Sequence, residues 1–586
     1  MKALLALKVY LVKYRWRFLF GIVFVFFANY FSAKVPVYAG KAINGITDRA
    51  TLMQELRDAA LLLVCIAGLG GAFRYLMRRV LIDTSRDIEF DFRNDIYKKL
   101  QSLDATFYDG NNTGDIMSRM TNDLDMIRMV LGPAIMYTAN TIFVLPIVLI
   151  QMFRLNWQVT VAGLMPLVLL PALVKIFGAR LHHGYRAQQD ALGDLTTYTQ
   201  ESLAGIRVVK AYAQEQNQER KFDAENDHYI KVSLDLAKTL AYFRPAIQLI
   251  AGSGLAIILV VGARQIMAGS LDYGDLTALL LLFGMLVWPM IAAGWVINLY
   301  QRANSAMERI AGITEAKSMV GDSPTAVSAA DLPGDLDVEF RDLTFAYPGA
   351  EEEPVLKNIT LKIPSGTTLG IIGRVGAGKS TLVHLLLRLY PVERGQLFLG
   401  GIDINDWPLA ELRRRVAIVF QETFLFSDTL SENIRFGALS ELTQEQIEDA
   451  ARQANVHDDI AGFPKGYETM LGERGINLSG GQKQRTAIAR ALVRDSSLLI
   501  LDDALSAVDT QTEEQILGHL ETVMANRSVF LISHRISTVS MADHIIVLED
   551  GVITAQGRHE SLLAQPGLYT ELHRKQLLEE EVEAIG

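Results

Sequence analysis

The stretch TLGIIGRVGAGKSTLVHLLL, residues 368–387, decides the fold of the second half of this chain. A short apolar run leads into a glycine-rich turn and then into a helical segment, which is the context in which G-x-x-x-x-G-K-[ST] binds phosphate. Glycines in the turn let backbone N–H groups close around phosphate oxygens, and the positive end of the helix adds attraction. We therefore expect Lys379 to contact the outer phosphates of a nucleotide and Ser380 to bind magnesium.

The stretch LLILDDALSAVD, residues 498–509, carries the acidic residues that such a site needs. Asp502 ends an apolar run, and doubly wound folds bind their ligands at the C-terminal ends of buried strands. A carboxylate there can hold magnesium directly or through water. The next residue, Asp503, stands where a base that prepares water for attack belongs.

A second anion-binding segment follows from LSGGQ, residues 478–482, and the helical run KQRTAIARAL after it. A helix start rich in serine and glycine binds anions through its free N–H groups. Because one phosphate-binding loop is already present, this second one requires a second nucleotide or the other face of a shared one.

Six stretches before residue 305 are apolar enough to cross a bilayer, which takes about 20 mostly apolar residues per helix. They lie at roughly 18–38, 59–78, 130–152, 157–178, 245–267 and 276–299. Only RLNW (154–157) separates the third from the fourth, so we expect a tight turn there. The first stretch follows a basic start without a small-residue cleavage site, and we interpret it as a retained helix.

The charge pattern predicts how these helices are oriented. The first 17 residues contain basic residues and no acidic ones (Lys2, Lys8, Lys13, Arg15 and Arg17). Positive charge marks the cytoplasmic side of spanning helices. We therefore expect the N-terminus and, after six crossings, the nucleotide-binding domain in the cytoplasm. The localisation predicted is an integral multi-pass protein of a bacterial inner membrane.

The composition agrees with a membrane protein. Half of the 586 residues are apolar, and the mean hydropathy is +0.20. The net charge of −10 gives no reason to expect affinity for nucleic acid. A single cysteine, Cys65, cannot build a disulfide framework or a thiolate metal site, and we expect it to be a small buried residue.

The two long cytoplasmic segments, roughly 79–129 and 179–244, mix apolar and charged residues at helical spacing. We expect spans two to five to continue into them as long helices. The tips would lie at FYDGNNTGD (107–115) and near SLAGIRVVKAYAQE (202–215), and we expect both to dock on nucleotide-binding domains.

Composition also sets the predicted domain boundaries. Small polar residues and two prolines mark a linker after the last span. The division expected is a transmembrane domain at 1–312, a linker at 313–334, a nucleotide-binding domain at 335–575 and an acidic C-terminal tail at 576–586.

Together these features resemble an ABC transporter of the exporter type over essentially the whole chain. The resemblance rests on the Walker A loop GRVGAGKST, the Q-loop in IVFQETFLF, the signature LSGGQ, the Walker B strand LLILD, the D-loop SAVD and the switch histidine in LISHRIST. It implies an α-helical six-span transmembrane domain followed by an α/β P-loop NTPase domain of the ABC type. It also implies ATP and Mg²⁺ as ligands.

The resemblance assigns roles residue by residue. ATP would be bound by Tyr347, whose ring stacks on adenine, and by Gly373, Arg374, Val375, Gly376, Ala377, Gly378, Lys379, Ser380 and Thr381. Magnesium would be bound by Ser380, Gln421 and Asp502, and catalysis would use Asp503, His534 and Gln421. The signature residues Leu478, Ser479, Gly480, Gly481 and Gln482 would face a partner's nucleotide, and Asp509 would end the D-loop.

In this family ATP is sandwiched between the Walker A loop of one nucleotide domain and the LSGGQ of another. That arrangement accounts for the second anion-binding segment. A chain with six spans and one nucleotide domain is a half-transporter, so the resemblance implies a second ABC half-transporter as partner.

Asp503 departs from the family pattern, in which glutamate follows the Walker B aspartate. Aspartate is shorter by one methylene, about 1.5 Å, and misplacing a catalytic group by roughly 1 Å can cost on the order of a hundredfold in rate. Two interpretations remain open. The chain either forms a homodimer that hydrolyses slowly, or it is the degenerate-site subunit of a heterodimer. We favour the heterodimer, because an unaltered LSGGQ beside Asp503 is typical of such subunits.

The function predicted is ATP-driven export of small amphipathic substrates (drugs, lipids or peptides) by alternating access, within a lipid membrane and without nucleic acid. An ATP-gated or regulatory membrane protein, in which slow hydrolysis times opening, is the alternative. A soluble ABC ATPase is excluded by the six apolar stretches. Aromatic residues in the spans agree with amphipathic substrates, but aromatics also anchor helices at membrane interfaces.

Overall fold

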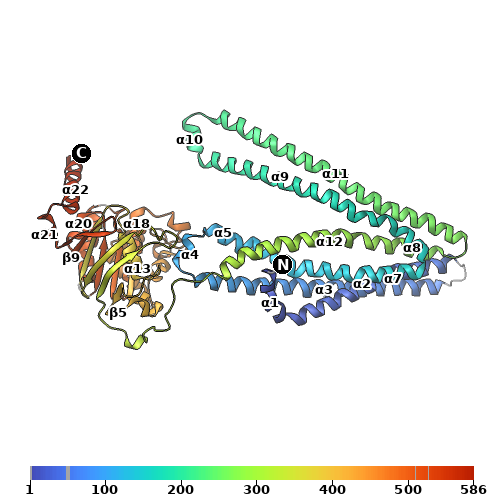
Figure 1. Cartoon of the computed structure of the whole chain (residues 1–586), viewed down its shortest axis with the longest axis horizontal. Helices are drawn as coiled ribbons and strands as arrows, with labels where there is room; N and C mark the ends of the chain where they lie inside the picture. Colours follow the sequence, from blue (N-terminus) through green and yellow to red (C-terminus); the bar gives the residue numbers. More distant parts are fainter. Residues whose placement is uncertain (1–2, 48–52, 509, 525–526, 586) are drawn as a thin grey trace. The chain divides into compact units, whose positions relative to one another are not determined.

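The computed structural model describes residues 3–47, 53–508, 510–524 and 527–585. Its contacts divide the chain into two compact units, which are Met1–Lys99 with Gly114–Glu315, and Leu100–Thr113 with Ala316–Gly586. The first is helical and the second contains both β-sheets (Figure 1). The predicted order, a helical domain followed by an α/β domain, is therefore confirmed. The segment 100–113 joins the second unit, which the predicted boundaries did not anticipate.

Long helices build the first unit. In chain order its helices are η1 Ala3–Leu7, α1 Lys8–Lys13, α2 Arg15–Thr47, α3 Met53–Gln101, α5 Thr113–Ser118, η2 Arg119–Asp123, α6 Leu124–Met129, η3 Val130–Ala134, α7 Ile135–Leu155, α8 Trp157–Leu164, η4 Met165–Leu169, α9 Leu170–Ala204, α10 Ile206–Ala211, α11 Glu215–Met267 and α12 Tyr273–Thr314. The last two residues of α3 and the first residue of α5 are assigned to the second unit.

Within the described residues, five apolar stretches of helix are long enough to cross a membrane by length and composition. They are Arg15–Gly45, Arg57–Gln101, Thr113–Leu155, Glu215–Met267 and Tyr273–Thr314. The predicted span at 157–178 is instead divided among α8, the 3₁₀ turn η4 and the start of α9. Pro166 and Pro171 lie at the starts of η4 and α9, and proline cannot donate the hydrogen bond that an unbroken helix needs there.

The predicted turns lie where the sequence placed them. Asn156 is extended (φ −161°), and its side chain caps α8 by accepting from the amides of Gln158 and Val159. The first cytoplasmic tip holds the short helix α4, Ala105–Asp109, before α5 begins. The second tip holds α10, between the end of α9 and the start of α11.

The long helices of the first unit pack in two groups. Helix α12 packs on α2 and α7, and α11 packs along α8 and α9 (Figure 1). Buried residues of these helices, among them Val148, Met152 and Phe283, form a continuous apolar core. Cys65 was expected to be buried but is exposed. An apolar residue of a spanning helix can face hydrocarbon, so it need not be buried in protein.

The N-terminal segment is fixed along α3 by a series of polar contacts. Tyr10 donates to Asp95 at 2.6 Å, Lys13 donates to Asp91 at 2.5 Å, and Arg17 pairs with Asp87. The same segment also carries large, exposed, apolar residues, which are Leu5, Val9, Val12 and Trp16. This segment is therefore amphipathic, as expected for one that lies at a membrane surface.

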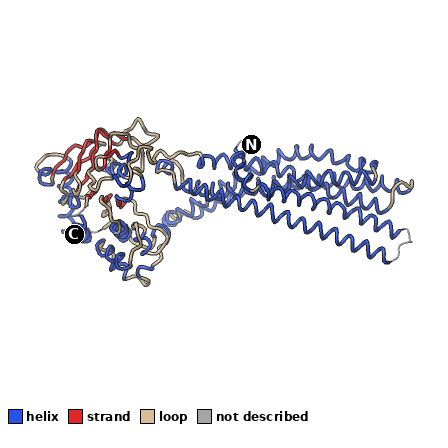
Figure 2. The backbone as a smooth tube through the Cα atoms, turned by 90° about the horizontal axis from the view of Figure 1, so that it is seen from below, coloured by secondary structure: helices blue, strands red, loops and turns tan. Residues whose placement is uncertain are grey.

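The second unit contains two sheets, whose strands Figure 2 shows in red. A four-stranded antiparallel sheet has the order β2-β1-β4-β5, and a six-stranded sheet has the order β10-β9-β3-β8-β7-β6. The strands are β1 Val338–Phe345, β2 Leu356–Ile363, β3 Thr368–Gly373, β4 Leu397–Leu399, β5 Ile402–Asp403, β6 Val416–Val419, β7 Leu498–Asp502, β8 Ser528–Ile532, β9 His544–Glu549 and β10 Val552–Gly557.

Helices cover these sheets and connect their strands. They are η5 Ala329–Asp331, α13 Lys379–Leu386, η6 Ile404–Asp406, α14 Leu409–Arg415, α15 Leu430–Arg435, α16 Gln444–Gln453, α17 His457–Ala461, η7 Gly466–Glu468, η8 Glu473–Gly475, α18 Gly480–Leu492, α19 Thr510–Met524, α20 Ile536–Ser540, α21 His559–Leu563 and α22 Leu568–Ile585.

The six-stranded sheet positions the site. Strands β9, β3, β8, β7 and β6 run parallel, and only β10 pairs antiparallel to its neighbour. Strands β3, β7 and β8 are buried along their whole length. Such strands read as continuous apolar runs, which is why the sequence revealed them. Their C-terminal ends meet at one edge, where an open α/β sheet binds its ligand.

Candidate functional site

The predicted site residues gather where four parallel strands end. Lys379 follows the loop after β3, Asp502 is the last residue of β7, and Gln421 and His534 follow β6 and β8. These strands are neighbours in the sheet. The topology therefore brings together residues that are more than 150 positions apart in the chain.

The phosphate loop contains two left-handed glycines. Gly376 has φ 83° and Gly378 has φ 96°, a conformation that favours glycine. A Cβ on Gly378 would also lie 2.8 Å from a methyl carbon of Leu356. The motif therefore needs glycine at position 378 for two reasons, its backbone conformation and its close neighbour.

Lys379 points its ammonium back into the loop. Its Nζ donates to the carbonyl oxygens of Gly373 and Arg374, each at 2.9 Å. The side chain is 7 % exposed, and this burial lowers the pKa of Lys379, although Asp503 and Asp502 oppose the shift. A buried cation that donates to backbone carbonyl groups is well placed to exchange them for phosphate oxygens.

Asp502 and Ser380 form the part of the site that suits magnesium. The hydroxyl of Ser380 donates to Oδ1 of Asp502 at 3.0 Å. Among the residues that the structure describes, Oδ2 of Asp502 has no hydrogen-bond partner although it is buried, and burial raises the pKa of Asp502. A buried carboxylate oxygen without a donor fits a divalent cation, and Mg²⁺ takes its remaining ligands from phosphates and water. Gln421, the third predicted ligand, contacts the neighbouring residue Asp503.

Asp503 adopts a strained backbone and is nearly buried. Its φ is 49°, its exposed fraction is 8 %, and its amide donates to the carbonyl of Ile532 at 2.9 Å. Nε2 of Gln421 lies 3.4 Å from Oδ2 of Asp503. The structure therefore brings two of the three predicted catalytic residues together.

His534, the third predicted catalytic residue, is exposed. Desolvation of its ring and the neighbouring Lys379 lower the pKa of His534, while Asp503 acts in the opposite direction. The imidazole is therefore neutral near pH 7, and a neutral imidazole can both donate and accept a hydrogen bond. Lys379, Asp503 and His534 share one electrostatic environment.

Tyr347, the predicted adenine-stacking residue, lies against the phosphate-loop helix. Its hydroxyl is 2.8 Å from Oγ1 of Thr381. Its ring meets Tyr390 edge to face, with ring centroids 4.9 Å apart and an interplanar angle of 87°. Tyr390 in turn donates to Asp109 of α4 at 2.8 Å. The first of the two predicted tips is thus bonded to the domain that holds the phosphate loop, as we expected.

The signature residues form a helix start. Ser479 caps α18 by accepting from the amide of Gln482, whose side chain accepts from the amide of Ser479 at 3.1 Å. Leu478 is buried, whereas Ser479 and Gly480 are exposed. This helix start can bind an anion presented from outside the chain. Asp509, the predicted end of the D-loop, lies outside the described residues.

Gln484 connects the signature helix to the loop after Asp503, and the sequence reasoning missed it. It is 6 % exposed. Its Oε1 accepts from the amide of Ala507 at 2.9 Å, and its Nε2 donates to Ser506 Oγ at 2.9 Å and to the carbonyl of Asp503 at 3.5 Å. A glutamine on the buried face of the amphipathic helix α18 is the signal that could have found it.

His384 was also missed. Its Nε2 lies 4.0 Å from Oδ2 of Asp502, but burial lowers the pKa of His384, so the ring is neutral near pH 7 and forms no ion pair. It is therefore a neutral neighbour of the carboxylate that we assign to magnesium.

Comparison with known proteins agrees with these observations. The profile of the "ABC transporter transmembrane region" matches residues 18–290, and that of "ABC transporter" matches residues 356–506. The chain is similar to the "Multidrug resistance-like ATP-binding protein MdlA" of Escherichia coli (strain K12), with 36% identity over 93% of this chain and 91% of the relative.

Two further similarities cover most of the chain. The "ATP-dependent lipid A-core flippase" of Salmonella typhimurium is 33% identical over 91% of this chain and 90% of the relative. Among solved structures, that of a bacterial Atm1-family ABC exporter with ATP bound aligns with a TM-score of 0.79 and 27% identity, over 96% of this chain and 99% of the other.

Proposed function

The chain belongs to the ABC transporters, as a half-transporter of the exporter type, and from that premise we propose that it uses ATP to export amphipathic substrates across a bacterial inner membrane. The main support for the proposal is that Lys379, Ser380 and Asp502 lie together at one edge of the six-stranded sheet. The same chain holds five apolar helices of membrane-crossing length among its described residues. Relatives named as multidrug-like proteins and lipid A-core flippases support amphipathic substrates.

In this proposal Mg²⁺ would be held by Ser380 and Asp502, and it would neutralise charge on the transferred phosphate. Lys379 contacts the outer phosphates and Tyr347 stacks on adenine. Gln421 and His534 position water and the departing phosphate beside Asp503. The exposed Ser479 and Gly480 of this chain bind the nucleotide held by a partner's Walker A loop.

One substitution tests the nucleotide site directly. We expect Lys379→Ala to abolish ATP binding at this chain's site and ATP-dependent accumulation of a fluorescent amphipathic dye in proteoliposomes. Lys465→Ala, at an exposed lysine of the same domain, should leave both unchanged. Retained binding of a photoreactive ATP analogue to the Lys379→Ala chain would show that the assignment of the site is wrong.

We also propose that this chain pairs with a second, different half-transporter. Asp503 supports this pairing. Its side chain is one methylene shorter than that of glutamate, and its contact with Gln421 is already long at 3.4 Å. The chain's own site would then hydrolyse slowly, while its intact LSGGQ completes the partner's active site.

Steady-state ATPase activity of the assembled complex distinguishes the two assemblies. For the heterodimer we expect Asp503→Ala to cost little and Asp503→Glu to raise turnover. Gly481→Ala should cost much, since its added Cβ would lie 3.0 Å from the carbonyl oxygen of Ala507 and disturb the surface offered to the partner's nucleotide. If Asp503→Ala abolishes activity as fully as Gly481→Ala does, then Asp503 is a working base and the homodimer is the better interpretation.

A further inference from the structure

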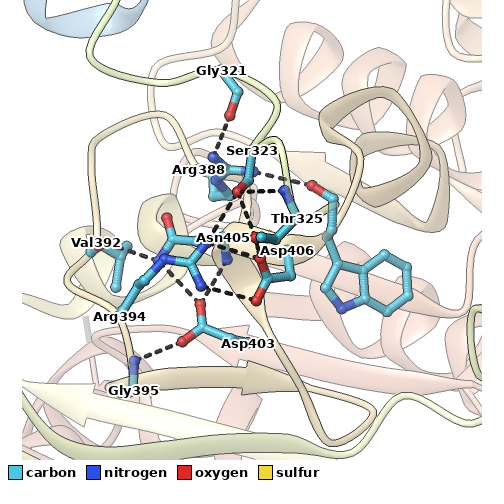
Figure 3. A network of polar contacts seen from close by, with 11 residues as sticks. Gly321, Ser323, Thr325, Arg388, Val392, Arg394, Gly395, Asp403, Asn405 and Asp406 are labelled. Atoms are coloured by element: carbon cyan, nitrogen blue, oxygen red, sulfur yellow. Dashed lines mark hydrogen bonds and ion pairs between the residues drawn. The ribbon is translucent and has the colours of Figure 1, made fainter. Parts of the chain in front are cut away.

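The segment between the last span and the nucleotide-binding domain is fixed to that domain by hydrogen bonds. Helix α12 continues through Thr314, two residues into the predicted linker. Residues 318–327, which we call the strap, then run along the loop that precedes α14 (Figure 3). Their composition predicts a linker, but their contacts show a segment held at several points.

Arg394 and Asp406 form the central attachment of the strap. The guanidinium of Arg394 binds the carboxylate of Asp406 with both terminal nitrogens, at 3.1 and 2.8 Å. The same guanidinium donates to Oγ of Ser323 and to Oγ1 of Thr325, each at 3.0 Å. The carbonyl of Asp406 accepts from the amide of Val327 at 2.8 Å. Figure 3 shows these side chains converging on one point.

Arg388 forms a second, buried attachment. It is 4 % exposed and has φ 45°. Its guanidinium donates to the carbonyl oxygens of Gly321 at 2.7 Å and Trp407 at 3.1 Å. Burial lowers the pKa of Arg388. The left-handed backbone of Arg388 and the burial of its charge each destabilise the folded state. Its contact with the strap therefore needs a reason beyond attaching the strap to the domain.

The position of Arg388 in the chain supplies that explanation. It follows the end of α13, whose first residue is Lys379. The eight residues of α13 make a rod of about 12 Å. Arg413 holds the far end of this rod by donating to the carbonyls of Leu387 at 3.1 Å and Arg388 at 2.9 Å. One end of the rod therefore binds phosphate and the other binds the strap.

The strap begins at the first cytoplasmic tip. Asp104 caps α4 by accepting from the amide of Phe107, and its Oδ2 accepts from the hydroxyl of Ser318 at 2.9 Å and from the amide of Val320 at 3.2 Å. Asp104 is 8 % exposed. One carboxylate thus joins the tip of the first cytoplasmic excursion to the start of the strap.

We propose that the strap is a mechanical connection between the phosphate site and the first cytoplasmic tip, in which Arg388 is a positioning residue that acts through α13. Movement of the rod on nucleotide binding shifts Gly321 through Arg388, and the strap carries that shift to Asp104 and α4. The proposal rests on the ATP-driven function proposed above and names a route for it beyond the direct contact of the tip with Tyr390.

Hydrogen–deuterium exchange of the assembled transporter in lipid nanodiscs, with and without ATP plus orthovanadate, tests the connection. The readout is the nucleotide-induced change in exchange at residues 86–100 and 114–123, which flank α4. We expect Arg388→Met, Arg394→Gln and Asp104→Asn each to reduce this change by roughly a factor of five, the lower end of typical coupling between sites. Arg388→Lys should restore most of it. The matched control is Arg452→Gln, which removes an exposed ion pair with Glu448 of α16.

ATP turnover distinguishes a positioning role of the strap residues from a role in stabilising the fold. We expect the turnover number and the KM for ATP of the strap variants to stay within about threefold of wild type, while the exchange response is lost. A full exchange response in Arg394→Gln and Asp104→Asn would overturn the proposal. So would loss of ATPase activity together with faster exchange throughout the nucleotide-binding domain, because the strap would then only stabilise the fold. The exchange measurement needs no transported substrate. Its result therefore tests the connection separately from the proposal that the protein exports amphipathic substrates.

Discussion

Replacing Gln484 by leucine should loosen the loop that follows Asp503 without unfolding the domain. Gln484 gives the Ala507 amide its acceptor and donates to Ser506, both at 2.9 Å. A net hydrogen bond is worth about 1 kcal/mol, and a buried N–H left without an acceptor costs about 1 kcal/mol or more. We therefore expect the free energy of local opening to fall by roughly 2–3 kcal/mol.

That loss has a measurable consequence. Because about 1.4 kcal/mol is a factor of ten, the open population should rise roughly 30- to 150-fold, and exchange of the Ala507 amide should accelerate equally. Hydrogen–deuterium exchange with residue-resolved fragmentation measures it. Gln453→Leu, which removes an exposed contact with Asp449, is the matched control.

The effect on activity follows from position. Gln484 lies between the signature helix and the loop after Asp503, so its loss should lower ATP turnover of the complex about tenfold or more. Unchanged exchange at Ala507 in a folded Gln484→Leu protein would refute the assignment of this residue as the connection. Equal acceleration by Gln453→Leu would refute it as well.

Three further predictions follow from individual contacts. Desolvation and Lys379 lower the pKa of His534, so ATPase activity should be constant above pH 7 and fall only below the ordinary histidine pKa of about 6.5. In His534→Gln this loss of activity at acidic pH should be absent. Its persistence would contradict the catalytic role assigned to His534. Arg490→Met removes three hydrogen bonds of 2.7–2.8 Å to backbone and side-chain amide oxygens. Calorimetry of the purified transporter should therefore show that this domain unfolds at a temperature about 10 °C lower. An unchanged unfolding temperature would show that these bonds do not stabilise the domain. Gly373→Ala places a Cβ 2.1 Å from the carbonyl oxygen of Leu548 and should abolish folded protein in detergent. Gly518→Ala should not, because no atom of the described residues lies within 4 Å of the added Cβ.

Much of the site could be predicted because its chemistry is local. The loop from Gly373 to Ser380 needs glycines and a lysine at fixed spacing, and Asp502 ends a short run of apolar residues that is typical of a buried strand. The interrupted helix at 157–178 was less predictable, because an apolar composition does not reveal where Pro166 and Pro171 break the backbone hydrogen bonds. The exposure of Cys65 shows the same limit, since composition cannot tell a lipid-facing position from a buried one.

The sequence by itself predicted the helical and α/β classes of the two parts of the chain and the candidate phosphate-binding residues, because both depend on neighbours a few positions apart. Only the tertiary structure decided which distant residues act together. Gln484 meets Ala507, Gln421 meets Asp503, and Arg388 meets Gly321 across 23, 82 and 67 positions. No local pattern specifies such pairs, since the order of the strands in the sheet and the path of the strap set them. The physical reason is that periodicity fixes which face of an element is buried, while packing fixes what that face meets.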